Sequence, residues 1–225
     1  RRPKEAKRLG EVIIFFCLTL ALGVFLQKDF GNSFIIGMAF FSIYLIGPML
    51  LEEKIKYIFI LVTGFVILGG IYVLGGGEIF QSYQMRRFDF LKPCTKYEIK
   101  GYQICNGYIA INEGGLFGVG IGNSRQKYSY IDEPHTDMVF AIITEEYGAI
   151  FAGFLFAIYT LILTRMTIIA NNAKKLRLKY LAFGIMIYTL LQIVINLGGL
   201  FGLMPFTGVI LPFLSYGGSF TIAYL

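Results

Sequence analysis

The chain has 225 residues, of which 56% are hydrophobic and only 15% are charged. In soluble domains about a quarter of all residues are charged. Several apolar runs in this chain reach the roughly 18 to 20 residues that cross a bilayer. This composition excludes an ordinary soluble domain and predicts an all-α polytopic membrane protein. The net charge of +6 does not indicate nucleic-acid binding, because most Lys and Arg residues lie in three short segments, 1–8, 54–56 and 165–179.

About six transmembrane helices are predicted in this chain, which is treated as a single membrane domain over residues 1–225. The short basic segments mark the cytoplasmic side, so both ends of the chain are expected there. One large extracytoplasmic loop is expected from about 75 to 136, and a Gly- and Pro-interrupted segment at 198–212. The predicted spans are the apolar runs 11–27, 34–51, 57–74, about 137–169 and 180–197, and a run that begins at 214.

The cysteines leave one question open. Cys94 and Cys105 lie in the same polar loop, and a disulfide between them is an open alternative if that loop is extracytoplasmic. Residues 102–111 mix apolar and polar side chains, which favours a short interfacial or re-entrant helix. Cys17 lies inside an apolar run and is interpreted as a packing residue. The sequence contains no CxxC motif or His/Cys cluster and therefore predicts no metal site.

A glycine-rich stretch, GVGIGN at 118–123, is superficially similar to nucleotide-binding loops. It does not follow a strand of a βαβ unit, and no GKS or GKT sequence accompanies it, so nucleotide binding is disfavoured. The simpler interpretation is a tight loop whose glycines permit close backbone approach. Backbone amides of such a loop could still bind phosphate.

Asp137 is the main candidate for catalysis. It is expected to start the helix that follows the large loop, where a carboxylate can cap free amides and is favoured by the helix dipole. The functional alternative is a general base near the outer membrane face, because a partly desolvated carboxylate can accept a proton.

Glu145 and Glu146 follow Asp137 in the same apolar segment. In an unbroken helix Glu145 lies about 12 Å along the axis from Asp137, and Glu146 faces roughly the opposite side. Glycosidases pair two carboxylates at roughly 5 to 9.5 Å, so neither glutamate suits that role. Both are therefore predicted to be structural or cavity-lining, paired with a polar group or a cation from another helix.

Four basic residues are expected on the outer side: Arg86, Arg87, Arg125 and Lys127. They are interpreted either as a solvated or lipid-headgroup-facing surface, or as a phosphate-binding group, since Arg binds phosphate through two hydrogen bonds.

Three further residues are assigned supporting roles. His135 is expected to support the loop through hydrogen bonds and to contact substrate, and Asp29 is expected to cap a helix at a turn. Ser215 lies in LPFLSYGGSF at 211–220, where a helix is broken at membrane depth. Broken helices there require protein or a water-filled cavity around them, so Ser215 is expected to face the same outer cavity as Asp137 and to bind substrate.

Four stretches resemble the SEDS family of shape, elongation, division and sporulation proteins, the group of FtsW, RodA and SpoVE. They are KDFGNS at 28–33, QMRRFDFLKP at 84–93, GYQICNGYIAINEGGLFGVGIGNSRQKYSYIDEPHTDMVFAIITEEYG at 101–148, and MPFTGVILPFLSYGGSF at 204–220. The GNSRQK sequence is more similar to division and sporulation members than to RodA. The resemblance implies a fold of about ten membrane helices, with this chain as the C-terminal portion.

The resemblance implies a peptidoglycan glycosyltransferase that polymerises lipid II at the outer face of the bacterial cytoplasmic membrane. Asp137 matches the family's essential acid and would be the base, with Arg86, Arg87 and Lys127 steadying the lipid pyrophosphate. The cofactor is left open between none and a divalent cation, Mg²⁺ or Mn²⁺. The implied partners are lipid II, a class B penicillin-binding protein transpeptidase and other divisome proteins.

Two alternatives stay open. A lipid II flippase would also use broken helices and buried acids, and Glu145 and Glu146 are the main residues that favour it. A non-catalytic division scaffold that positions a transpeptidase is the third hypothesis.

Overall fold

The computed structural model describes residues 30–47, 94, 102–131 and 134–217, together with 52, 54–56, 58–59 and 62–63. Every regular element within these ranges is helical, as the predicted all-α class requires. Several predictions fall outside the described residues: the first span, most of the third, the last span beyond 217, and the site residues Asp29, Arg86 and Arg87.

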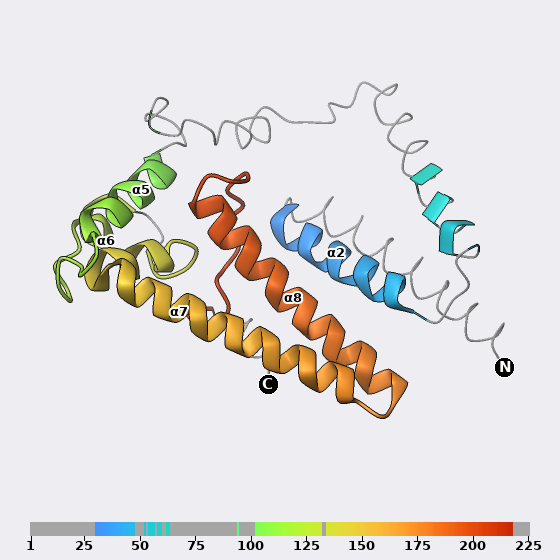
Figure 1. Cartoon of the computed structure of the whole chain (residues 1–225). Coiled ribbons are helices and arrows are strands. Elements are labelled where there is room, and N and C mark those ends of the chain that lie inside the picture. Colours follow the sequence, from blue (N-terminus) through green and yellow to red (C-terminus); the bar gives the residue numbers. More distant parts are fainter. Residues whose placement is uncertain are drawn as a thin grey trace, which may run out of the picture. The chain divides into compact units, whose positions relative to one another are not determined.

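The chain divides into two units, Arg1–Met85 and Arg86–Leu225. In the first unit, α2 (Phe30–Ile46) overlaps the second predicted span, 34–51, but begins and ends earlier than expected. The second unit contains α5 (Tyr102–Gly114), α6 (Arg125–Ser129), α7 (Val139–Asn172) and α8 (Leu176–Leu200) (Figure 1).

Lys54 binds the carbonyl end of α2. This residue is 9% exposed, and its Nζ donates a hydrogen bond to the Leu45 carbonyl at 2.5 Å. The Tyr44 hydroxyl donates to the Lys54 carbonyl at 3.1 Å. A cation at the carbonyl end of a helix is favoured by the helix dipole, so Lys54, itself in helical conformation, stabilises the last turn of α2.

Two described helices, Val139–Asn172 and Leu178–Leu200, are long and apolar enough to cross a membrane. They pack against each other and run antiparallel, with α5 and α6 near the beginning of α7 (Figure 1). The chain after α8 is non-helical from 201 to 217 and returns to α7, where the Tyr159 hydroxyl donates a hydrogen bond to the Pro212 carbonyl. The second unit is therefore a helical hairpin with a non-helical segment packed along it.

The prediction that Asp137 starts α7 is wrong. Residues 134–138 form a turn, Met138 is the N-cap residue, and the helix begins at Val139. Met138 is fully buried, and its carbonyl accepts the first helical hydrogen bonds, from Ala141 and Ile142. The N-cap position is thus taken by a buried apolar residue, one position after Asp137.

The predicted helix break at Gly198 is also misplaced, because α8 continues through Gly198 and Gly199 to Leu200. A Cβ on Gly198 would lie 2.9 Å from the Met204 side chain, and one on Gly199 would lie 3.2 Å from Phe206. These glycines therefore let the returning segment pack against α8 and do not end the helix.

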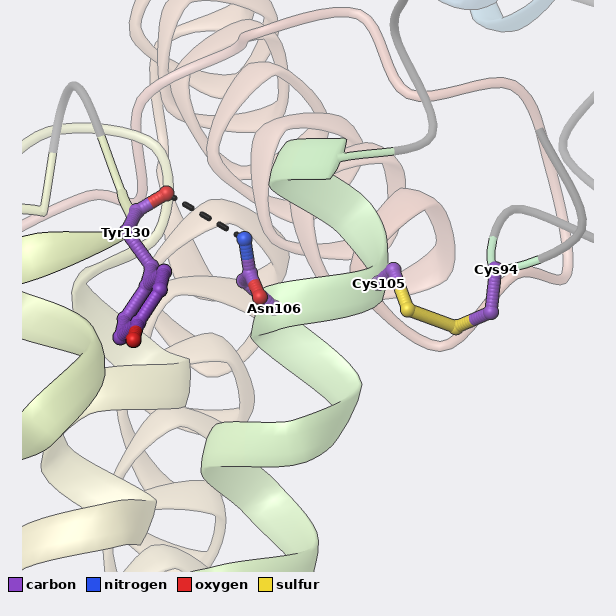
Figure 2. Close-up of a disulfide and its surroundings, with 4 residues drawn as sticks. All are labelled: Cys94, Cys105, Asn106 and Tyr130. Atoms are coloured by element: carbon purple, nitrogen blue, oxygen red, sulfur yellow. Dashed lines mark hydrogen bonds between the residues drawn. A yellow bond between two sulfur atoms is a disulfide. The ribbon is translucent and has the colours of Figure 1, made fainter. Parts of the chain in front are cut away.

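Cys94 and Cys105 form a disulfide, with their Cα atoms 5.0 Å apart (Figure 2). The bond fixes residue 94 to the first turn of α5. Helix α5 begins at Tyr102, as expected for the short helix at 102–111, and continues to Gly114. The neighbouring Asn106 is 1% exposed and donates to the Tyr130 carbonyl at 3.3 Å (Figure 2). Two consecutive residues of α5 thus hold this helix to residues 94 and 130.

A kink at Gly148 divides α7, with φ 84° and ψ 171°. The kink removes the helical hydrogen bonds from residues 149 and 150 to residues 145 and 146. Residues 115–122, called the glycine loop here, replace all four partners. The amides of Ala149 and Ile150 donate to carbonyls 115 and 116 at 2.9 and 3.3 Å, and the amides of Val119 and Gly120 donate to carbonyls 145 and 146 at 2.9 and 3.1 Å. Buried backbone groups need such partners.

This exchange requires glycines on both sides. A Cβ on Gly114 or Gly118 would lie 2.2 Å from a carbonyl oxygen of α7, and a Cβ on Gly148 would lie 2.3 Å from the Leu116 carbonyl. The sequence-based interpretation of close backbone approach is therefore confirmed for Gly118. The amides of residues 118–120 donate to protein carbonyls, so they are not available to bind phosphate.

Replacing Gly118 by Ala should destabilise the protein more than replacing Gly122. Both residues have similar positive φ, 82° and 77°, but among the described residues nothing lies within 4 Å of a Cβ on Gly122. We expect Gly122→Ala to cost about 1–3 kcal/mol for the backbone conformation alone, and Gly118→Ala to cost about 1–3 kcal/mol more. Melting temperatures of the two purified full-length variants measure the difference, and equal losses would contradict the close approach.

Candidate active site

The turn that contains His135, Thr136 and Asp137 is held by its backbone carbonyls. The Tyr216 amide donates to the His135 carbonyl at 2.9 Å, and the Ser215 hydroxyl donates to the Thr136 carbonyl at 2.5 Å. The third bond, to the Asp137 carbonyl, comes from α8. All three donors lie far along the chain from the turn, so its position depends on the folding of the whole second unit.

Asn196 of α8 supplies that third bond. Its Nδ2 donates to the Asp137 carbonyl at 2.9 Å and to the Val209 carbonyl at 2.6 Å. The residue is only 2% exposed, and its Oδ1 has no hydrogen-bond partner among the described residues. One side-chain amide therefore joins the turn to the segment that returns after α8.

Ser215 makes a second connection between the same two segments. Its Oγ accepts a hydrogen bond from the Leu211 amide at 2.7 Å while donating to Thr136. The hydroxyl proton is thus used within the protein. In this arrangement Ser215 supports the turn, and only a rearrangement would free its hydroxyl for the predicted substrate contact.

The Asp137 carboxylate is half-buried and lies beside a glycine. The Thr136 hydroxyl donates to its Oδ1 at 3.3 Å, and a Cβ added to Gly208 would lie 3.4 Å from its Oδ2. Gly208 itself is exposed and has φ 70°. A carboxylate that is held from its backbone and partly open to solvent can accept a proton from a bound hydroxyl group.

Glu145 belongs to a different arrangement. It is fully buried, and its carboxylate accepts hydrogen bonds from the Ser124 hydroxyl at 2.5 Å, the Arg125 amide at 2.9 Å and the Gln126 amide at 3.4 Å. These amides begin α6, whose N-cap Ser124 also accepts from the Lys127 amide at 3.0 Å. A carboxylate is favoured at the amino end of a helix, so Glu145 fixes α6 to α7.

Glu146 and Lys127 form an ion pair, with Nζ 3.5 Å from Oε1 and side chains that are 8% and 24% exposed. The ammonium also lies 5.5 Å from the centre of the Tyr128 ring. That Oε1 has no hydrogen-bond partner among the described residues, so the contact is electrostatic. Arg125 remains exposed on the same short helix.

The predicted site residues therefore fall into two groups. The first group consists of the turn at 134–138, called the held turn here, and of Ser215, which donates to it. The turn contains Asp137 and His135, and the His135 side chain is exposed. The second group is called the α6 cluster here. It consists of Arg125 and Lys127 of α6 and of the two acids that bind to the α6 region, Glu145 and Glu146. Sequence reasoning missed Asn196 and Gly208, although an Asn inside an apolar span is itself a signal that a polar partner lies opposite.

Comparison with known proteins identifies the class of protein. The model of the cell cycle protein family of FtsW, RodA and SpoVE matches residues 1–225, so the chain belongs to this family of membrane proteins of cell division and cell-wall growth. It is 38% identical over 203 residues to the probable peptidoglycan glycosyltransferase FtsW of Bacillus subtilis, covering 89% of this chain and 50% of the relative.

Other relatives agree. The probable peptidoglycan glycosyltransferase FtsW of Coxiella burnetii is 38% identical over 199 residues, which cover 86% of this chain and 51% of that relative. The stage V sporulation protein E of Bacillus subtilis is 38% identical over 179 residues, covering 77% and 49%. The chain thus spans about half the length of these curated relatives.

A solved structure shares the fold. It concerns the structural coordination of polymerization and crosslinking by a peptidoglycan synthase complex, and one of its chains superposes with a TM-score of 0.64 at 24% identity. The match covers 94% of this chain and 56% of the other.

Replacing Asn196 by Leu should loosen both segments that it joins. The change leaves the buried Val209 carbonyl and the partly buried Asp137 carbonyl without this donor, which costs about 1–3 kcal/mol for a fully buried group. We expect hydrogen exchange of the amides in 209–216 to accelerate on the order of tenfold or more, measured by mass spectrometry on the full-length protein. Thr189→Val is the matched control, because Thr189 is also fully buried on α8 and its hydroxyl donates to Ile185 of the same helix. Unchanged exchange in Asn196→Leu would contradict the proposed connection.

Proposed function

We propose that the protein is a peptidoglycan glycosyltransferase that polymerises lipid II at the outer face of the bacterial cytoplasmic membrane, with Asp137 as the general base. The observation that carries the proposal is the turn at 135–137, where a half-exposed carboxylate sits on a backbone held by three hydrogen bonds. The names of the relatives and the fold shared with a peptidoglycan synthase complex support it.

The reaction needs one general base. A sugar hydroxyl of the acceptor attacks the anomeric carbon of the donor, a new C–O bond forms, and the bond to the lipid pyrophosphate breaks. The hydroxyl proton passes to an Asp137 oxygen as the bond forms. The departing pyrophosphate is a stable anion and needs no proton from the protein, which explains why a single acid can serve where glycosidases use two.

The pyrophosphate needs positive charge around it. Among the predicted cations, Arg125 is exposed and open to an anion, whereas Lys127 would first have to leave Glu146. Arg86 and Arg87 stay predicted for the same role. The described residues contain no group of three or more His, Cys, Asp or Glu side chains that could hold Mg²⁺ or Mn²⁺, and the proposed mechanism uses only the chain's own groups.

The proposal includes a membrane orientation and partners. The turn and α6 would lie on the outer side, and the basic segment between α7 and α8 would lie in the cytoplasm. A class B penicillin-binding protein would cross-link the new strands, and other divisome proteins would bind the same assembly. The cell cycle description of the family supports this setting.

The flippase hypothesis loses its main residues in this arrangement. Glu145 accepts three hydrogen bonds from the α6 region, and Glu146 pairs with Lys127. Neither acid is available to a transported headgroup while these bonds persist. The polymerase is therefore the better-supported function, and the scaffold hypothesis is decided by activity.

Asp137→Asn should strongly lower the rate of polymerisation, because the amide is nearly the same shape as the carboxylate but cannot accept the proton. We expect a loss of about 10²- to 10⁴-fold, the contribution of a general base. The assay supplies lipid II in detergent to the full-length protein with its class B penicillin-binding partner and separates the glycan strands by gel electrophoresis. Glu113→Gln is the control, because Glu113 is an exposed acid in the same outer segment.

Polymerisation that persists in Asp137→Asn would refute the proposed base. Movement of lipid II across vesicles without any polymerisation by the wild type would favour the flippase, and the absence of both activities would favour the scaffold.

A further inference from the structure

The glycine loop exposes four apolar side chains to the surroundings. Leu116 is 63% exposed, Phe117 82%, Val119 39% and Ile121 73%. These four residues are called the apolar tip. Neither the held turn nor the α6 cluster uses them.

The backbone of the loop explains why the apolar tip cannot fold inward. Its amides at 118–120 and its carbonyls at 115 and 116 are bonded within the protein, mostly to α7. The backbone therefore occupies the side that faces α7 and leaves the side chains outside. The segment 114–124 also contains no charged residue, which is unusual for a loop that faces only water.

The position of the tip along α7 indicates what surrounds it. Hydrogen bonds from Ala149 and Ile150 fix the loop beside the kink at Gly148. From Gly148 to Asn172 the helix rises about 37 Å, slightly more than the roughly 30 Å of a bilayer core. With the basic segment after Asn172 in the cytoplasm, the kink and the apolar tip come to the outer boundary of the hydrocarbon. This step rests on the proposed membrane orientation.

The neighbouring surface of α7 has the same character. Tyr147 and Phe151 stack at 4.8 Å on either side of the kink, and they are 38% and 37% exposed. Ile150, whose amide bonds to the loop, is 59% exposed. Exposed aromatic side chains are typical of the bilayer interface, and the exposed Arg125 after the loop suits phosphate headgroups.

We propose that the apolar tip inserts into the outer leaflet of the phospholipid bilayer and anchors the glycine loop there. Because the loop also holds the kink of α7, this anchor fixes the depth of the kink and of the α6 cluster beside it. A partner protein is the other conceivable occupant. Lipid is favoured because, in the proposed orientation, the tip lies at the boundary of the spanning half of α7, beside the exposed apolar side chains of Ile150 and Phe151.

Fluorescence quenching by lipid tests this inference. The full-length protein without other free cysteines, and with the Cys94–Cys105 disulfide kept, receives Phe117→Cys or Ile121→Cys. Each variant is labelled with the environment-sensitive dye NBD and placed in phosphatidylethanolamine and phosphatidylglycerol vesicles. Doxyl-labelled lipids should quench the dye at both positions several-fold more than at Glu113→Cys or Asn123→Cys, which are exposed polar positions nearby.

The controls separate the ways in which the proposal can fail. A membrane-impermeant thiol reagent should modify Glu113→Cys from outside, and modification only from inside would overturn the orientation itself. With the orientation confirmed, equal quenching at all four positions would overturn insertion. Shielding of Phe117→Cys that appears only when the penicillin-binding partner is added would overturn it in favour of a protein interface. Polymerase activity enters none of these readouts.

Discussion

The hydrogen bonds accepted by three successive carbonyls, those of His135, Thr136 and Asp137, are the contacts on which the proposed active site depends. Their donors come from α8 and from the segment that returns after it. A turn held only by its own residues would leave the carboxylate free to rotate with the outer loop. Because the donors lie on distant parts of the chain, the candidate base is positioned by the fold itself, which is what a preorganised site requires.

The three acids of this region have different roles in the same arrangement. Glu145 is buried, and its carboxylate accepts three hydrogen bonds from the amino end of α6. Glu146 pairs with Lys127. Both contribute to architecture, since a buried carboxylate without partners would be strongly unfavourable. Of these three acids, Asp137 alone combines partial exposure with an adjacent small residue, Gly208. The kink at Gly148 belongs to the same assembly, because α7 exchanges backbone hydrogen bonds with the glycine loop there.

Local signals in the sequence predicted the helical class, the positions of α7 and α8, and the role of Gly118 in close approach. They failed where a distant contact decides the outcome. A buried Met138 stands at the N-cap of α7, and Met204 packs against Gly198 where α8 continues past it. The role of Asn196 could not be derived either, because no local pattern indicates which carbonyls a buried amide will reach.

A double-mutant cycle between Asn196→Leu and Asp137→Asn tests the central claim most directly, with the initial rate of lipid II polymerisation by the full-length complex as the readout. If Asn196 acts by positioning Asp137, Asn196→Leu lowers the rate on its own but adds almost nothing once Asp137 is replaced. Fully additive losses would contradict the claim, because they would mean that Asn196 and Asp137 contribute independently.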